Sequence, residues 1–252
     1  MRRPPPRARG FTLVELAVVL AIVGFLLGSL MYTLSAQVDA RNVSETQQRL
    51  QSAQELLLAF AIVNGRLPCP AIAASAGQES FTAGPGSACT TNYGGFLPAV
   101  TIGFQPLDTQ GFGLDAWGNR VRYAVSSTTW GATARYTTQH VSGTGTAWAL
   151  TTTPTDLVVC SQAPTPVTAV TCDAGTAVTN QNTVVAIVYS VGKNGATGGG
   201  GTNEARNLDG NALFVSRVPD PASAAGGEFD DQMVWIPVGV LYSKLMSTGA
   251  LP

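Results

Sequence analysis

Between Phe11 and Asn64 the hydrophobic pattern changes once, near position 35. From Phe11 to Leu34 the chain is almost wholly apolar, and Glu15 is the one charged residue in that run. A helix of roughly 24 residues, rising about 1.5 Å per residue, is long enough to cross the hydrocarbon core of a bilayer. We therefore expect residues 11–34 to form a transmembrane helix.

Residues 35–64 show the pattern of an amphipathic helix. Small or apolar side chains recur there at steps of three and four residues, which marks one helical face: Val43, Thr46, Leu50, Ala53, Leu57 and Phe60. Gly65 and Pro68 then supply a stop. We expect one helix to continue from the apolar run to Asn64. The alternative is a membrane helix and a separate soluble helix, joined near Ser35 to Asp39.

Residues 65–252 have the texture of short strands separated by turns. The alternation of Val121, Tyr123 and Val125 predicts a strand, and the continuously apolar Val184–Val188 predicts a buried central strand. Further strands are expected within 146–153, 156–162, 211–218 and 231–237, and a short helix within 240–246. The expected fold class is α+β, a long N-terminal helix packed on an antiparallel sheet.

Charge is scarce and unevenly placed. Asp, Glu, Lys and Arg make up only 12% of the chain, against about 25% in an average soluble protein. Four arginines precede the apolar run, and without them 10 basic residues face 15 acidic ones. Basic residues favour the cytoplasmic side of a membrane, so the N-terminus should be cytoplasmic and the bulk of the chain outside. A net negative domain excludes general binding to nucleic acid phosphates.

The four cysteines fall into two pairs that are local in sequence, Cys69 with Cys89 and Cys160 with Cys172. An even number of spaced cysteines in an exported domain is typical of disulfides. No CxxC motif occurs and His140 is the single histidine, which disfavours structural zinc. We expect both local pairs to be disulfide-bonded.

Glu15 separates three interpretations of the apolar run. A secretory signal would end in a small-x-small cleavage site, and a cut after Ala36 or Ala40 is conceivable, but a carboxylate in the apolar core is poor signal chemistry. A plain membrane anchor leaves the carboxylate unexplained. A charge at the bilayer centre costs ~2.5–3.5 kcal/mol, so such a residue usually has a partner and a task.

The third interpretation explains the carboxylate. The basic leader 1–10 and the sequence Gly10-Phe11-Thr12-Leu13-Val14-Glu15 resemble the N-termini of type IV prepilins and type II secretion pseudopilins. The resemblance implies cleavage between Gly10 and Phe11 by a membrane prepilin peptidase, which then methylates the Phe11 amine. The retained helix would join other pilin or pseudopilin subunits in a filament, built by an assembly platform in the inner membrane.

Cleavage after Gly10 would create a cation at Phe11, four residues before Glu15. In a staggered filament, the amine of one subunit can lie beside Glu15 of its neighbour. Each buried charge then has a partner, which offsets most of its desolvation cost. We therefore expect the partner of Glu15 to lie in another copy of the chain.

Two later segments are also similar to this family. Asp115–Asn119 is similar to the Asp-x-Trp-Gly-Asn element before the first sheet strand of pseudopilins, and Tyr189–Gly195 is similar to their Ser-x-Gly-x-x-Gly turn. Some pseudopilins bind calcium in a loop of this region. The resemblance thus implies a calcium site at Asp209, Asp230 and Asp231, and a plain solvated loop is the alternative. No other cofactor is expected.

Three functions are compatible with these features. The first is a structural subunit, a minor pilin or pseudopilin, because the globular part is larger than that of a major pilin and the apolar helix lacks proline. The second is a pilus-borne adhesin, or a minor pilin that binds substrate or DNA. The third, a membrane-anchored enzyme, lacks a visible nucleophile and base, since a lone histidine in a Thr- and Gly-rich segment is more typical of a surface residue.

Overall fold

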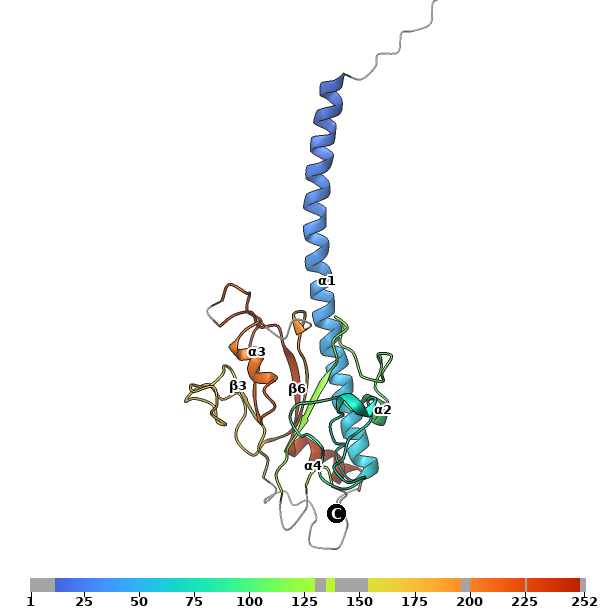
Figure 1. The fold of residues 1–252 in the computed structure, drawn as a ribbon, viewed down its shortest axis with the longest axis vertical. Coiled ribbons are helices and arrows are strands. Elements are labelled where there is room, and N and C mark those ends of the chain that lie inside the picture. Colours follow the sequence, from blue (N-terminus) through green and yellow to red (C-terminus); the bar gives the residue numbers. More distant parts are fainter. Residues whose placement is uncertain (1–11, 130–134, 139–153, 196–199, 225, 250–252) are drawn as a thin grey trace, which may run out of the picture. The chain divides into compact units, whose positions relative to one another are not determined.

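The computed structural model describes all residues except 1–11, 130–134, 139–153, 196–199, 225 and 250–252, and it omits the side chains of 29–36. The chain divides into two units, Met1–Ser44 and Glu45–Pro252. Helix α1, Leu13–Asn64, begins in the first unit and ends in the second (Figure 1). The prediction of one continuous helix is confirmed, and the two-helix alternative is not what the chain forms.

In the first unit the described side chains of α1 are exposed on every side. Leu13 is 86% exposed, Leu20 62% and Phe25 79%. Within the described part of the chain, no helix combines the length and the hydropathy that a membrane crossing requires. The transmembrane span at 11–34 stays a prediction.

In the second unit α1 buries one face, as its periodicity predicts. Leu50, Ala53 and Leu57 are fully buried, and Phe60 packs against the same core cluster. Leu58 and Ala61 join this face and widen the stripe beyond the predicted positions. The prediction is wrong at one place: Val43 is 45% exposed, because the buried part of the face begins at Thr46.

The main sheet has four antiparallel strands in the order β1-β2-β4-β6. Their bounds are β1 Gly95–Phe96, β2 Arg122–Val125, β4 Val184–Ser190 and β6 Gln232–Pro237. Every residue of β4 is buried, which confirms the predicted central strand. Along β2, Tyr123 and Val125 belong to the core cluster that includes α1, whereas Ala124 belongs to the cluster on the other face.

A second sheet departs from the expected antiparallel pattern. Strands β3, Val158–Cys160, and β5, Leu213–Val215, pair in parallel. Parallel neighbours need a crossover connection of a dozen or more residues. The chain between β3 and β5 supplies one, because it contains β4 and helix α3, Thr202–Asn207. This long path permits the parallel direction of β5, which no local sequence pattern indicates.

The remaining elements are short. They are η1 Ala73–Ser75, α2 Ala99–Ile102 and α4 Val238–Ser247. Helix α4 contains the predicted segment 240–246, and its buried residues Leu241, Tyr242 and Leu245 lie at helical spacing. The strand predicted at 146–153 lies outside the described residues.

The Asp115 carboxylate ties the turn before β2 to the end of β4. Asp115 is 2% exposed, and its Oδ2 accepts a 2.6 Å hydrogen bond from Ser190 Oγ. Its Oδ1 accepts the backbone N–H groups of Trp117 at 2.9 Å and Asn119 at 2.8 Å. Asn119 Nδ2 in turn donates to the Gly192 carbonyl at 2.7 Å. The two later segments that resemble pseudopilins thus meet at one buried carboxylate.

The same turn is bonded to α1. Arg49 donates to the carbonyls of Leu114 at 3.0 Å and Asp115 at 2.6 Å, and it pairs with Glu45. The backbone N–H of Ala116 donates to Thr46 Oγ1 at 3.1 Å. Burial raises the pKa of Asp115, and the hydrogen bonds from Ser190 and the turn oppose that rise. Polar side chains of α1 therefore hold the turn before β2, in addition to the apolar packing of the helix.

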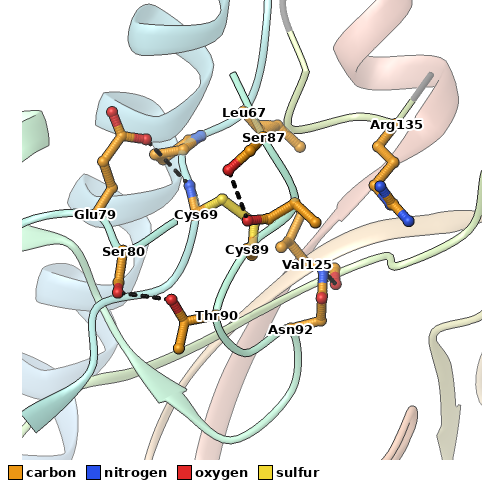
Figure 2. The surroundings of a disulfide bond; sticks show 12 residues. Leu67, Cys69, Glu79, Ser80, Ser87, Cys89, Thr90, Asn92, Val125 and Arg135 are labelled. Carbon is orange, nitrogen blue, oxygen red and sulfur yellow. Dashed lines mark hydrogen bonds between the residues drawn. A yellow bond between two sulfur atoms is a disulfide. The ribbon is translucent and has the colours of Figure 1, made fainter. Parts of the chain in front are cut away.

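Two disulfides join the cysteine pairs that the sequence analysis predicts. Cys69 and Cys89 are joined with a Cα–Cα distance of 5.3 Å, and Cys160 and Cys172 with 5.6 Å. Figure 2 shows the first, where Glu79 accepts the N–H of Cys69 at 3.2 Å. Glu79 also accepts two 2.7 Å hydrogen bonds from Arg66.

Removal of either disulfide should destabilise the second unit. Replacing Cys69 and Cys89 together with alanine should lower the free energy of unfolding by ~2–4 kcal/mol, because the unfolded chain regains the freedom of a closed ring. The same change at Cys160 and Cys172 should have an effect that is smaller by about 0.5 kcal/mol, since this ring spans 12 residues and the first spans 20. Urea denaturation of the full chain in detergent measures both, with reduced wild type as the control. Equal stability of either variant and wild type would show that the rings contribute nothing.

Candidate functional site

Thr12 and Glu15 cap the start of α1 by hydrogen bonds in both directions. Thr12 precedes the first helical residue, and its backbone N–H and its hydroxyl both donate to Glu15 Oε2 at 2.9 Å. The backbone N–H of Glu15 donates back to Thr12 Oγ1 at 3.2 Å. This is a capping box, in which two otherwise unsatisfied N–H groups at a helix start gain acceptors.

The capping box gives Glu15 a partner within its own chain, which the sequence analysis missed. The signal was present in the sequence as Thr12-x-x-Glu15, the usual spacing of such a box. Both bonds from Thr12 fall on Oε2. No hydrogen bond to Glu15 Oε1 is found within the described residues, so this oxygen is left for a further partner. Gly10, Phe11 and His140 lie outside the described residues.

A second candidate site is a cluster of three carboxylates in the globular unit. Glu204 lies on α3, and Asp230 and Asp231 directly precede β6. One oxygen of each lies within 4.8 Å of the others. Glu204 is 1% exposed and Asp231 is 6% exposed. Three negative groups so close together and so buried need donors, protons or a cation to be stable.

Nitrogen donors satisfy much of this cluster. Glu204 Oε1 accepts the N–H of Asp230 at 2.7 Å, and Oε2 accepts Asn194 Nδ2 at 2.9 Å and the N–H of Gly200. Asp230 Oδ2 accepts the N–H groups of Lys193 at 2.8 Å and Asn194 at 3.2 Å. The carboxylates therefore fasten Lys193, Asn194 and Gly200 to α3 and to the start of β6.

Two features remain after these bonds are counted. Asp230 Oδ1 is buried and, within the described residues, has no hydrogen-bond partner. Asp231 Oδ2 accepts Asn207 Nδ2 at 2.7 Å, yet burial, together with the charges of Glu204 and Asp230, raises the pKa of Asp231 to about 8. Burial and Glu204 also raise the pKa of Asp230. At neutral pH Asp231 thus keeps a proton that the unfolded chain would release.

The residue set expected for calcium needs one correction. Asp209 is not part of the cluster, because it lies after the end of α3 and pairs with Arg206 at 2.6 Å. Glu204 takes its place, since α3 turns this side chain inward. The sequence analysis treated the segment around Asp209 as a loop, so it predicted neither helix α3 nor the burial of Glu204.

Calcium binding at this corrected set stays a prediction. Calcium takes six to eight oxygen ligands. The three carboxylates offer oxygens of the right chemistry, but several of these already accept N–H groups. A cation would have to displace the protons held by Asp230 and Asp231, so its affinity would rise with pH.

Stability should fall as pH rises through the range in which this cluster loses its protons. A carboxyl group whose folded pKa lies above its unfolded value binds more protons when folded, so the free energy of unfolding should drop between about pH 4 and about pH 8. Asp231→Asn should flatten this drop, because the group with the pKa of about 8 is gone. Thermal unfolding of the full chain in detergent at several pH values measures it.

Asp209→Asn is the matched control, since Asp209 lies outside the cluster and should leave the pH slope unchanged. An Asp231→Asn protein with the wild-type slope would contradict the assignment. Added Ca²⁺ at high pH tests the metal prediction separately: a rise in Tm that Asp231→Asn abolishes and Asp209→Asn retains supports it, and no rise opposes it.

Comparison with known proteins bears on the N-terminal site. Residues 5–31 match the family model described as the prokaryotic N-terminal methylation motif. The match includes Gly10, Phe11, the capping pair and the apolar start of α1. No curated protein and no solved structure matches the chain. The chain therefore carries the N-terminal signature of the type IV prepilins and pseudopilins.

Proposed function

We propose that this chain is a structural subunit, a minor pilin or pseudopilin, of a type IV pilus or type II secretion filament. The observation that carries the proposal is the methylation motif at residues 5–31. In this proposal a prepilin peptidase cuts after Gly10 and methylates the amine of Phe11. The mature chain then enters a filament through its N-terminal helix.

The surface of α1 in the first unit supports assembly through this helix. Its described side chains from Leu13 to Leu27 are apolar apart from Glu15, and they are exposed around the whole circumference. A helix that is apolar on all sides is stable only when lipid or other protein covers it. Before assembly the cover would be the inner membrane, with residues 11–34 as the span. In the filament, the helices of neighbouring subunits would replace the lipid.

The proposed orientation follows from charge and from the cysteines. Arg2, Arg3, Arg7 and Arg9 precede the helix and favour a cytoplasmic N-terminus. The globular domain would then lie on the periplasmic side. Disulfides persist in such oxidising compartments, in agreement with the two bridges of the globular unit.

Glu15 would have two tasks in this proposal. Its Oε2 closes the helix start with Thr12, and its Oε1 is open to the ammonium group of Phe11 in a neighbouring subunit. The capping box fixes the rotamer of the carboxylate before the neighbour arrives, so little side-chain entropy is lost when the ion pair forms. A slip of one helical turn would leave both charges without partners, which sets the axial register.

Processing is directly measurable. The mature chain should begin at N-methylated Phe11, and mass spectrometry of the native N-terminus decides this. Gly10→Val should block cleavage, because a branched side chain should not fit a peptidase subsite shaped for glycine. Gly24→Val is a matched control, since this glycine lies beyond the cleavage site and has open space around it. An intact Met1, or a cut near Ala36, would refute the prepilin assignment.

Variants of Thr12 and Glu15 separate the two tasks of the carboxylate. Glu15→Gln retains a capping-box side chain and loses the charge, whereas Thr12→Ala loses the cap and keeps the charge. If the neighbour's Phe11 amine is the essential partner, Glu15→Gln and Glu15→Ala should both assemble poorly, because a broken buried pair costs ~3–5 kcal/mol. Thr12→Ala should assemble nearly as well as wild type, since a lost cap costs only ~0.5–2 kcal/mol.

The measurement is the sheared-filament fraction relative to the membrane pool. Insertion and cleavage should survive in all three variants, because the Gly10–Phe11 bond is unchanged. Assembly of Glu15→Ala at the wild-type level would remove the main physical support for the ion pair. A defect in Thr12→Ala as large as that in Glu15→Ala would assign the carboxylate to capping alone.

A further inference from the structure

A cavity of about 440 Å³ lies where five separate stretches of the globular unit meet. The stretches are the loop before β1, the start of β3, the ring closed by Cys160–Cys172, the turn before β4 and the turn before β5. A second hollow of about 210 Å³ shares Val158, Thr171 and Gln181 with it, so the two adjoin, and together they are called the groove below. The larger cavity alone is in the size range of small-molecule sites.

The surface that the larger cavity exposes is mostly apolar, and the polar side chains in its lining are nearly all uncharged. Its hydrogen-bonding side chains include Gln181, Asn182 and Asn211, and Val158 and Ala212 contribute apolar surface. Neither lysine nor arginine is among the lining residues, and Asp156 is the single charged one. The two asparagines each use Oδ1 to accept a backbone N–H, from Thr155 and Leu213, which leaves their Nδ2 groups to donate to a ligand.

Within the described residues, Asp156 is held mainly through one oxygen. Its Oδ2 accepts the Tyr93 hydroxyl and the Ser127 hydroxyl, the latter at 2.7 Å. In the same part of the chain, Oδ1 has one long contact of 3.3 Å, with the Ser127 N–H. Burial and the neighbouring carboxylate raise the pKa of Tyr93, so its hydroxyl remains a donor. The cavity therefore presents a fixed acceptor, Asp156 Oδ1, beside an aromatic ring.

A further observation points to a ligand. Thr155 lines the cavity, is 4% exposed, and its Oγ1 is buried with no hydrogen-bond partner within the described residues. A buried hydroxyl without a partner is unusual unless water or a ligand completes it. Asn182 has φ +61°, a left-handed conformation that asparagine adopts more readily than most side chains and that glycine also accepts.

We propose that this groove binds an uncharged oligosaccharide. A sugar ring offers hydroxyls that both donate and accept, and an apolar C–H face. The carboxamides and Asp156 match the hydroxyls, and the Tyr93 ring with Val158 matches the face. An anionic ligand would find no cation here and would be repelled by Asp156. The adjoining second hollow gives room for more than one sugar unit. This inference does not depend on N-terminal processing.

The test uses the full chain in a zwitterionic detergent that has no sugar head group. Saturation-transfer NMR titrations with maltotriose, cellotriose and triacetylchitotriose provide the neutral probes, and sialyllactose provides an anionic one. At least one neutral probe should bind saturably. Gln181→Ala and Asn182→Gly should each weaken it about tenfold or more, the scale of one lost good contact. Glycine accepts the backbone of Asn182, and Gln181 is exposed, so neither change should prevent folding.

Gln78→Ala is the matched control, because Gln78 is an exposed carboxamide that does not line either hollow. Its affinity should equal that of wild type. Three results would each overturn the proposal: no saturable binding of any neutral probe, binding that neither groove variant weakens, or equal binding of sialyllactose. Because filament assembly is not measured here, failure of this proposal and failure of the filament proposal can be told apart.

Discussion

The buried carboxylate of Asp115 is the interaction on which the globular unit depends. It is removed from water, which is unfavourable for an ion, and three donors from a tight turn and from β4 offset that cost. The backbone of the turn that it shapes is hydrogen-bonded to Arg49 and Thr46 of α1. Helix, turn and central strand are therefore joined through one side chain. Without its acceptors, several buried N–H and O–H groups would lose their partners together.

Several other carboxylates of this sparsely charged chain also bind backbone N–H groups. Glu79 accepts hydrogen bonds from Arg66 and from the N–H of Cys69 beside the first disulfide, and Glu204 accepts the N–H of Gly200 just before α3. Glu15 accepts the N–H of Thr12 at the start of α1. In each case the carboxylate satisfies backbone donors that no strand or helix satisfies. The group around Asp230 and Asp231 differs, because it places more negative charge than its donors balance and therefore responds to protons or a cation.

How much could be predicted depended on the range of the interactions. The helix and the strand β4 were predictable because their apolar periodicity is strong and local. The parallel β3–β5 pair was not, because its partners are about fifty residues apart and no local signal marks their pairing. Helix α3 was hidden by the glycines around it, so the grouping of Glu204, rather than Asp209, with Asp230 and Asp231 could not be foreseen. The groove brings together residues from 93 to 212, a convergence that no window of sequence reveals.

The second disulfide has a consequence for when the groove exists. Val170 and Thr171 form part of its wall, and the ring that contains them is closed by Cys160 and Cys172. Thiols remain reduced in the cytoplasm and oxidise outside it. In the proposed pathway, in which the globular unit is exported, the Cys160–Cys172 ring of a newly made chain would therefore stay open until the unit has left the cytoplasm. Export would then complete the wall of the groove as well as deliver the subunit.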